Sequence, residues 1–319
     1  MVEKIIKGFT INFMKKQRLY YSLNEFLKEK FGEKVKKIPL DAGLSCPNRD
    51  GTKGYGGCIY CDPKGSGTGL FKEGKSLEEQ VKLFLEIFKK KKFKKFIAYF
   101  QSFCNTYAPL EKLKEIYDIV YLDPSIVGLA IGTRPDCIDE NIAKLLKSYQ
   151  EKGYYLWIEL GLQSMHNQTL KLINRGHTFE DFLQGYNLLK KYDIPVVVHI
   201  IFGLPGETKE MMLETVKTLA KLKIDGIKFH ALYIVKGSKM AELYLKGKYN
   251  PLEIEFYANL VAEALTYLPP TTVIHRLCSE ARKEDILAPL WVSRKMEVIN
   301  LIRKIMSKKE LYQGKNYTE

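Results

Sequence analysis

The chain contains no apolar run long enough to cross a lipid bilayer. Its longest apolar stretch, residues 194–205, is interrupted by His199 and is shorter than the about 20 residues that a membrane-spanning helix needs. The first residues mix charged and apolar side chains, and they lack the apolar core and small-residue cleavage site of a secretory signal peptide. We therefore expect a cytosolic protein with no membrane partner.

Cysteine is scarce and unevenly distributed. The chain has six cysteines in 319 residues, which in a reducing compartment argues against a disulfide framework and favours ligands or buried thiols. Three of them, Cys46, Cys58 and Cys61, form a C-x11-C-x2-C pattern in a glycine-rich segment. The other three stand alone in the sequence, and we expect ordinary thiols at Cys104, Cys137 and Cys278.

Acidic residues are outnumbered by basic ones, 37 against 51, which gives a formal net charge of +14. Such an excess favours a polyanionic partner through phosphate contacts and counterion release, although a lysine-rich composition without such a partner would look the same. The first 40 residues carry ten basic and four acidic side chains, and residues 88–96 alternate lysine with phenylalanine. This run would suit an RNA backbone and its unpaired bases, but the phenylalanines also have the spacing of core positions.

No low-complexity linker divides the chain, so we expect one domain with extensions. Amphipathic helical patterns alternate with β-branched or aromatic runs. The predicted strands cover residues 35–40, 93–101, 126–133, 155–162, 195–202 and 226–235. The predicted helices between them cover residues 76–91, 111–120, 139–149, 179–192 and 208–222. This alternation predicts an α/β fold with a parallel sheet and helices on its outer face, as an incomplete (β/α)6 barrel or a doubly wound sheet.

The barrel is expected to occupy residues 35–240. A basic N-terminal extension, residues 1–34, precedes it, and a helix-rich C-terminal extension, residues 241–319, would pack on it. This second extension includes a helix-rich stretch at 251–268, a possible seventh strand at 272–277 and a helix at 291–306. In either architecture the loops that follow the strands carry function, and the cysteine segment follows the first predicted strand.

Three thiols are one ligand short of a closed structural zinc site. The loop holds no fourth cysteine and no histidine, and the first histidine of the chain is His166. A zinc site would need a ligand from elsewhere, such as Cys104, Cys137 or an aspartate. A [4Fe–4S] cluster held by three thiolates instead leaves one iron open to an external ligand, so the pattern favours an iron–sulfur site.

The amino-acid sequences of several segments identify a family more specifically than the cysteine spacing does. The loop SCPNRDGTKGYGGCIYCD, followed by YFQSFCNTYAP, GTRPDC, ELGLQS, INRGH and FGLPGET, resembles the radical S-adenosylmethionine (radical SAM) enzymes. Within them it resembles the family of the bacterial proteins YtqA and YhcC, which is related to the catalytic subunit of Elongator. The resemblance runs from about residue 18 to about residue 302, although the first cysteine gap is longer than the usual C-x3-C-x2-C. It implies an incomplete (β/α)6 barrel, a [4Fe–4S] cluster and S-adenosylmethionine that is cleaved to a 5′-deoxyadenosyl radical.

The resemblance also implies roles for individual residues. The cluster would be bound by Cys46, Cys58 and Cys61. The residues that would bind or shield the cofactors are Tyr60, Gln101, Asn105, Thr106, Glu159, Gln163, Arg175, Ile201 and Gly203. The remaining candidates, which would face the substrate, are Arg134, Asp136 and His177.

Some of these residues have structural alternatives. A carboxylate inside the apolar strand around Glu159 is costly unless it is paired, so a buried ion pair is the alternative to a cofactor contact there. His177 would serve equally well at a helix start. His199 and His230 lie inside predicted strands, and we expect both to be hydrogen-bonded core imidazoles.

For the substrate, the resemblance implies tRNA, modified on the C5 side chain of the wobble uridine. The leading expectation is removal of a hydrogen atom from that side chain and loss of part of a carboxymethylaminomethyl group, without the acetyltransferase chemistry of Elongator. The electron would come from a one-electron reductase of the flavodoxin or ferredoxin type. Two alternatives stay open: a radical SAM oxidoreductase that acts on a small molecule, like the oxygen-independent coproporphyrinogen oxidases, and a non-catalytic, zinc-stabilised RNA-binding protein.

Overall fold

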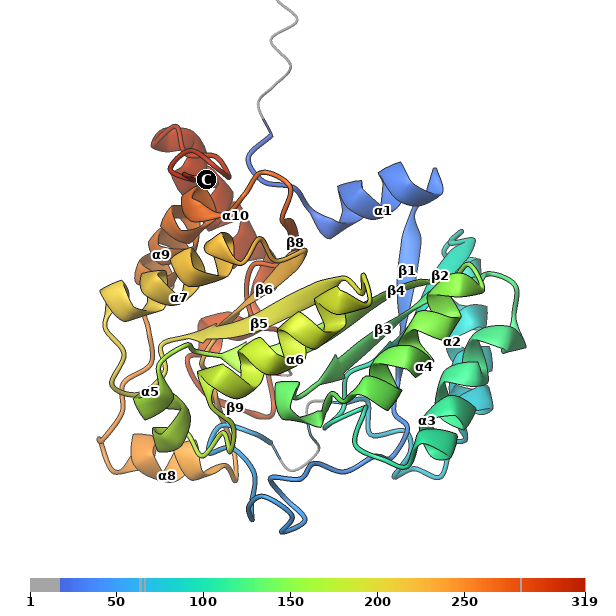
Figure 1. The fold of residues 1–319 in the computed structure, drawn as a ribbon. Coiled ribbons are helices and arrows are strands. Elements are labelled where there is room, and N and C mark those ends of the chain that lie inside the picture. The colour runs from blue at the N-terminus through green and yellow to red at the C-terminus, as the bar shows by residue number, and fades with distance from the viewer. Residues whose placement is uncertain (1–17, 63–64, 66, 282, 319) are drawn as a thin grey trace, which may run out of the picture.

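The computed structural model describes residues 18–318 except 63, 64, 66 and 282 (Figure 1). The first 17 residues of the predicted basic extension thus lie outside the described residues. Seven parallel strands form one sheet, and each strand pairs with the next along the chain. The strands are β1 Val35–Leu40, β2 Lys95–Phe100, β3 Ile126–Thr133, β4 Tyr155–Gln163, β5 Val196–Phe202, β6 Gly226–Ala231 and β8 Val273–Arg276.

The strand order never reverses, whereas a doubly wound sheet has a switch point where it does. The sheet is therefore an incomplete parallel barrel with β1 and β8 at its two open edges, as expected. The helices that cover its outer face are α2 Leu77–Lys90, α3 Leu110–Tyr117, α4 Glu140–Glu151, α6 Phe179–Lys191, α7 Lys209–Lys221, α9 Ile254–Tyr267 and α10 Lys295–Lys308 (Figure 1). The short helix α5, Asn167–Leu172, follows β4, and a second short helix, α8, Lys239–Leu245, lies between β6 and α9.

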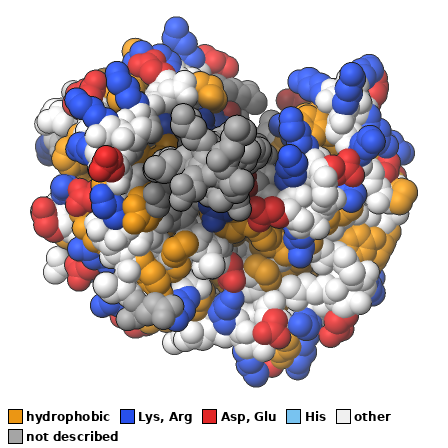
Figure 2. Space-filling model, turned by 90° about the horizontal axis from the view of Figure 1, so that it is seen from above, with side chains coloured by type: hydrophobic (Ala, Val, Ile, Leu, Met, Phe, Trp, Pro, Cys, Tyr) orange, Lys and Arg blue, Asp and Glu red, His pale blue; other side chains and the backbone are white. Residues whose placement is uncertain are grey.

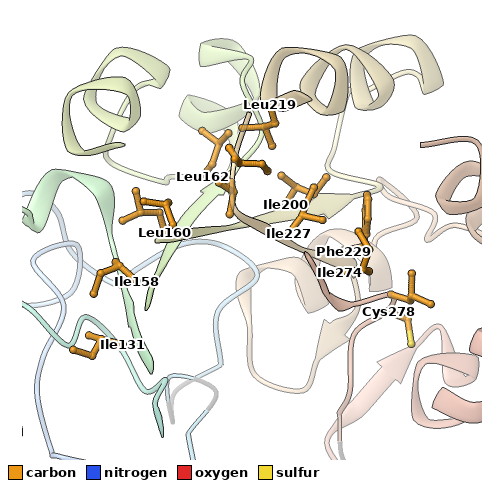
Figure 3. Packing of buried hydrophobic residues seen from close by; sticks show 14 of the residues in the cluster. Ile131, Ile158, Leu160, Leu162, Ile200, Leu219, Ile227, Phe229, Ile274 and Cys278 are labelled. Carbon is orange, nitrogen blue, oxygen red and sulfur yellow. The ribbon is translucent and has the colours of Figure 1, made fainter. Parts of the chain in front are cut away.

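The predicted helix at 76–91 illustrates how local rules set these elements. The Ser76 hydroxyl accepts a hydrogen bond from the backbone amide of Glu79, and the Glu79 carboxylate accepts one from the backbone amide of Ser76, so both hydrogen bonds of this capping box are made. Its apolar stripe contributes Val81 and Leu85 to the main core. Figure 3 shows part of this core, where strand side chains such as Leu160 and Ile200 lie on the side of the sheet that faces Leu219 of α7.

Two predicted strands differ from the observed ones. The prediction of one strand over 226–235 is wrong, because β6 ends at Ala231 and β7, Ile234–Val235, pairs antiparallel with β9, Ile286–Ala288, in a separate sheet. The chain leaves the main sheet because Leu232 and Ile234 pack in a second apolar cluster around Met240. The second strand begins at Lys95, not Phe93, because the Phe93 amide still bonds to the carbonyl of Phe88 at the end of α2.

The predicted seventh strand is confirmed as β8, so the sheet continues beyond residue 240. The N-terminal helix α1, Leu23–Phe31, contacts both edge strands, β1 and β8. Its side chain Leu27 packs in a small cluster with Trp157 and Val197. Since successive strand residues point to opposite faces and the neighbours of Trp157 face the helices, this cluster fills one end of the barrel interior.

The lysine and phenylalanine run at 88–96 is accounted for by packing. Phe88, Phe93 and Phe96 pack in or against the main core, as the structural alternative predicted. Lys89 forms an ion pair with Asp123 at 2.9 Å, and Lys90 forms one with Glu86 at 2.7 Å. On the face seen in Figure 2, basic side chains are spread among acidic and apolar ones. In the described part of the chain, no helix has the length and apolarity to span a membrane.

Candidate functional site

A cavity lies at the carboxyl ends of the strands, where the long loop after β1 folds over the open barrel. We call it the cysteine cavity, because the side chains of all three clustered cysteines line it. It brings together most of the residues that the sequence predicts for the site. They are Cys46, Cys58, Tyr60, Cys61, Gln101, Arg134, Glu159, Gln163, Arg175 and Ile201.

The glycines of the loop let its backbone turn tightly beside the cysteines. Gly56 and Gly57 have φ of +76° and +75°, a region that side-chain-bearing residues rarely occupy. The Gly57 amide donates to the carbonyl of Asn48 at 2.8 Å, and the Asn174 side chain donates to the Gly57 carbonyl at 2.8 Å. The Asn48 side chain in turn donates to the Asn174 carbonyl at 2.6 Å, so two asparagines that the sequence analysis did not select hold the loop to the INRGH segment.

The thiols lie in a buried setting with polar donors nearby. Burial raises the pKa of Cys61 to about 11 and also raises that of Cys46. Arg175 places Nη1 3.6 Å from Cys58 Sγ, and Asn48 places Nδ2 3.8 Å from the same sulfur. Iron displaces thiol protons on binding, and these donors suit the negative charge of a thiolate-bound iron–sulfur cluster. The donor set therefore fits the expected group.

The zinc alternative needs ligands gathered around one ion. Throughout residues 18–62, 65, 67–281 and 283–318, no three His, Cys, Asp or Glu side chains are gathered closely enough to hold one metal ion, and this includes the three clustered cysteines. The three thiols share the wall of one cavity, and no fourth ligand that would close a zinc site lies with them among these residues.

Arg175 is more constrained than the sequence suggests. Its Nη2 donates to the Gly161 carbonyl at 2.6 Å, so the guanidinium is held between β4 and Cys58. His177 does not line the cysteine cavity: its ring nitrogens lie 3.1 Å from the carbonyls of Gly161 and Thr178. Burial, with the charge of Arg175, lowers the pKa of His177 to about 3. This imidazole is therefore neutral, and its polar contacts are with backbone carbonyls rather than with the cavity.

Arg134 and Asp136 form a buried ion pair after β3. Two parallel hydrogen bonds of 3.0 and 2.9 Å join them, and Lys53 approaches Asp136 at 2.7 Å. Burial opposes the charge of Asp136, but the hydrogen bonds and charge of Arg134 outweigh it and lower its pKa to about 2. Arg134 reaches the cysteine cavity, whereas Asp136 lines a separate cavity beside Lys53.

Three predicted cofactor contacts do not line the cysteine cavity. Asn105 donates to the Gly132 carbonyl at 2.8 Å, and the Thr106 hydroxyl donates to the Cys137 carbonyl at 2.6 Å. The Gly203 carbonyl accepts a hydrogen bond from the hydroxyl of Tyr249 at 2.6 Å. In this structure the three residues brace strands and loops around the site.

Glu159 occupies the inner side of β4 at the floor of the cavity. It accepts hydrogen bonds from Tyr99 at 2.9 Å and Trp157 at 3.0 Å. It also pairs with His199 at 3.0 Å and, more closely, with the Lys228 ammonium. Burial opposes its ionisation, but the charge of Lys228 outweighs burial and holds the pKa of Glu159 well below its usual range. The contacts of Glu159 are therefore those of a buried ion pair, the structural alternative to a cofactor contact.

Sequence reasoning missed other residues of the cavity. His199 and His230 were expected in the core, yet both line the cavity. His230 Nε2 is buried without a hydrogen-bond partner among the described residues. Phe103 and Tyr233 also contribute. The available signal was the position of Lys228 and His230 at alternate places in β6, GIKFHA, which puts both on one face.

The chain matches known proteins over most of its length. The model of the Radical SAM superfamily matches residues 49–219, and that of the Radical_SAM C-terminal domain matches residues 224–308. The uncharacterized protein YtqA of Bacillus subtilis is 42% identical, with 94% of this chain and 93% of that protein aligned. These matches show that the chain belongs to the radical SAM superfamily, in the family of YtqA, whose enzymes use a [4Fe–4S] cluster and S-adenosylmethionine.

Two further similarities point toward Elongator-like proteins. A tRNA uridine(34) acetyltransferase of Methanocaldococcus infernus is 30% identical over 58% of this chain and 34% of that protein. The solved structure of the Elp3 protein from the same archaeon, lacking its N-terminal residues, superposes with a TM-score of 0.66 at 21% identity, covering 88% of this chain and 64% of that one. The second similarity shows a shared fold.

Proposed function

We propose that this radical SAM enzyme modifies the C5 side chain of the wobble uridine in tRNA. The observation that carries the proposal is the sequence similarity to an enzyme named for tRNA uridine 34, at 30% identity over 58% of this chain. The carboxyl ends of the strands are where barrel enzymes place their chemistry. The expected product is a uridine that has lost part of a carboxymethylaminomethyl group.

Cys46, Cys58 and Cys61 are proposed to hold the cluster, since all three line one cavity. When bound, the cluster and S-adenosylmethionine supply a 5′-deoxyadenosyl radical that takes a hydrogen atom from substrate carbon. Tyr60, half-buried between the last two cysteines, keeps water from that side of the cavity. A reductase of the flavodoxin or ferredoxin type is proposed to deliver the electron.

The other residues receive roles that follow from their contacts. Gln101 directly follows β2, Gln163 ends β4, and both line the cavity, where their amides suit the amino group and ribose of the cofactor. Ile201 adds an apolar wall for adenine. Arg175, which donates toward Cys58 Sγ, is proposed to stabilise thiolate charge rather than to bind the cofactor carboxylate.

The test begins with anaerobic reconstitution with iron and sulfide. We expect visible absorption from the wild-type protein and from C278A, a buried cysteine of the main core, and loss of that absorption in C46A, C58A and C61A. A colourless wild-type protein with stoichiometric zinc would contradict the proposal for the cysteines.

The substrate is tested by nucleoside mass spectrometry. Transfer RNA carrying carboxymethylaminomethyluridine is incubated with reduced holoenzyme and S-adenosylmethionine, and we expect the wobble nucleoside to change as 5′-deoxyadenosine accumulates. Unchanged wobble uridine, together with 5′-deoxyadenosine formed in the presence of a porphyrinogen, would support the small-molecule alternative and reject tRNA.

A further inference from the structure

The interior of the half-barrel is charged directly beneath the cysteine cavity. We call this set the inner charged layer, and it comes from five different strands: Lys37, Glu159, His199, Lys228 and Arg276. Lys228 pairs in the sheet register with His199 on one side and with Arg276 on the other. The strand neighbours of Lys228, Ile227 and Phe229, belong to the helix-facing core, so the lysine points inward.

Basic side chains outnumber acidic ones in this layer. The basic side chains are Lys37, Lys228 and Arg276, and the one acid is Glu159; burial lowers the pKa of both lysines, whereas an arginine stays charged. His199 is neutral, because burial and then the charge of Lys228 lower its pKa to about 4. Of the outlying acids, Glu280 is exposed and forms an ion pair with Lys295 at 2.7 Å.

Glu159 is already engaged on both carboxylate oxygens. Its Oε2 faces Tyr99, His199 and Lys228, and its Oε1 accepts from Trp157. A carboxylate has about four acceptor positions, so Glu159 compensates Lys228 and has little capacity left. The nearest approach of Lys37 to it is 4.0 Å.

The guanidinium of Arg276 has N–H donors that no acceptor among the described residues engages. Its side chain is half-buried, and across the described residues its guanidinium forms no hydrogen bond or ion pair with another side chain or carbonyl. After burial, its charge contributes to lowering the pKa of Lys37 and of Lys228, which places it electrostatically among them. Two residues after Lys228 on the same strand, His230 lines the cysteine cavity, and its buried Nε2 has no hydrogen-bond partner among the described residues. Buried polar groups normally have hydrogen-bond partners, so the unpartnered His230 nitrogen points to a ligand in the cavity.

We propose that the inner charged layer, through Arg276 and Lys37, binds a carboxylate at the end of the substrate's uridine side chain. This inference rests on the proposed function. Lys37 shares Glu159 with Lys228, whereas Arg276 has no ion pair among the described residues, so the layer can accept one further negative charge, and a guanidinium binds a carboxylate through two parallel hydrogen bonds. The far end of the interior is closed by Trp157, Val197 and α1, so the layer is approached from the cysteine cavity, and we expect it to take a terminal group on a base rather than a backbone phosphate flanked by two sugars.

The carboxylate of the cofactor is the other possible anion, and the test separates the two. Unreduced holoenzyme is titrated with synthetic anticodon stem-loops that carry 5-carboxymethylaminomethyluridine or 5-aminomethyluridine, the second of which lacks the carboxylate. We expect wild type to bind the first RNA about tenfold more tightly. In R276Q this preference disappears, in K37Q it shrinks, and the affinity for the aminomethyl RNA stays unchanged.

K36Q is the matched control for K37Q, because it removes the same charge from the same strand. Lys36 lies against the Phe88 and Phe93 rings on the outer face of the sheet. K36Q should keep the full preference. The dissociation constant of S-adenosylmethionine is measured for each variant by equilibrium dialysis. If R276Q weakens cofactor binding and leaves the RNA preference intact, the layer serves the cofactor and the inference is overturned.

The two proposals fail differently. If wild type modifies the wobble uridine without any preference for the carboxylate-bearing RNA, only the inner-layer inference falls. If wild type leaves every wobble uridine unchanged, the proposed function falls and the inference falls with it.

Discussion

The buried pair of Glu159 and Lys228 makes a quantitative prediction about stability. Each residue is 1% exposed, so removing one charge leaves the other in the barrel interior without its counter-ion. Breaking a buried pair in this way costs about 3–5 kcal/mol. We expect a loss of that size in the free energy of unfolding for E159Q, in which Lys228 keeps only neutral partners.

K228M should be less damaging. Glu159 then retains hydrogen bonds from Tyr99, Trp157 and His199, and Lys37 stays 4.0 Å away. We expect a cost of about 1–3 kcal/mol, the range for a buried polar group that loses part of its compensation. The double variant E159Q/K228M has neither charge, so it should be more stable than the sum of the two losses implies, by about 2 kcal/mol.

The assay is equilibrium urea unfolding of the cluster-free protein, with the slope of the transition compared among all four proteins. Similar slopes allow the midpoints to be read as changes in stability. If the two single losses add to the double loss within about 0.5 kcal/mol, Glu159 and Lys228 do not act as a pair and the reasoning is refuted.

Two further changes test the frame of the site. D136N should lower the free energy of unfolding at neutral pH, because Arg134 loses its counter-ion. The pKa of Asp136 is lowered from 3.8 to about 2. The stability that its charge adds is therefore present above about pH 4 and is lost as the pH falls toward 2. The gap in urea midpoint between wild type and D136N should narrow over that range, and a constant gap would contradict this. G185A should lower the free energy of unfolding by about 1–3 kcal/mol, because the new Cβ would lie 2.5 Å from the Pro135 carbonyl. Q184A, on the exposed side of α6, is its control, and equal losses in the two variants would contradict the packing argument.

Local patterns in the sequence were sufficient for most of the architecture. The capping box at Ser76 and Glu79 and the apolar stripe that follows it predicted α2, and both are observed. A similar signal, Ser22 and Glu25, caps α1, although the sequence analysis treated that segment only as an extension. Helix starts are predictable because a capping side chain bonds to a backbone amide only three residues away.

The faces of the strands were harder to predict. A strand that is buried on both sides reads as a continuous apolar run, so its sequence does not show which residues point to the helices and which point inside. His199 and His230 were therefore assigned to the core, although they line the cavity. The break between β6 and β7 was missed for the same reason, since Leu232 and Ile234 are as apolar as the residues of a continuing strand.

The sequence by itself determined the alternation of strands and helices, the cysteine loop and the family. The first two depend on residues close together in the chain, and the family depends on sequence segments that can be compared directly with those of other proteins. Only the tertiary structure decided which groups meet. Arg175 approaches Cys58 across 117 positions, and Lys228 pairs with Glu159 across 69. Such contacts arise when the sheet curls and brings the inner faces of distant strands together, and the cost of burying an unpaired charge then requires that these particular side chains meet.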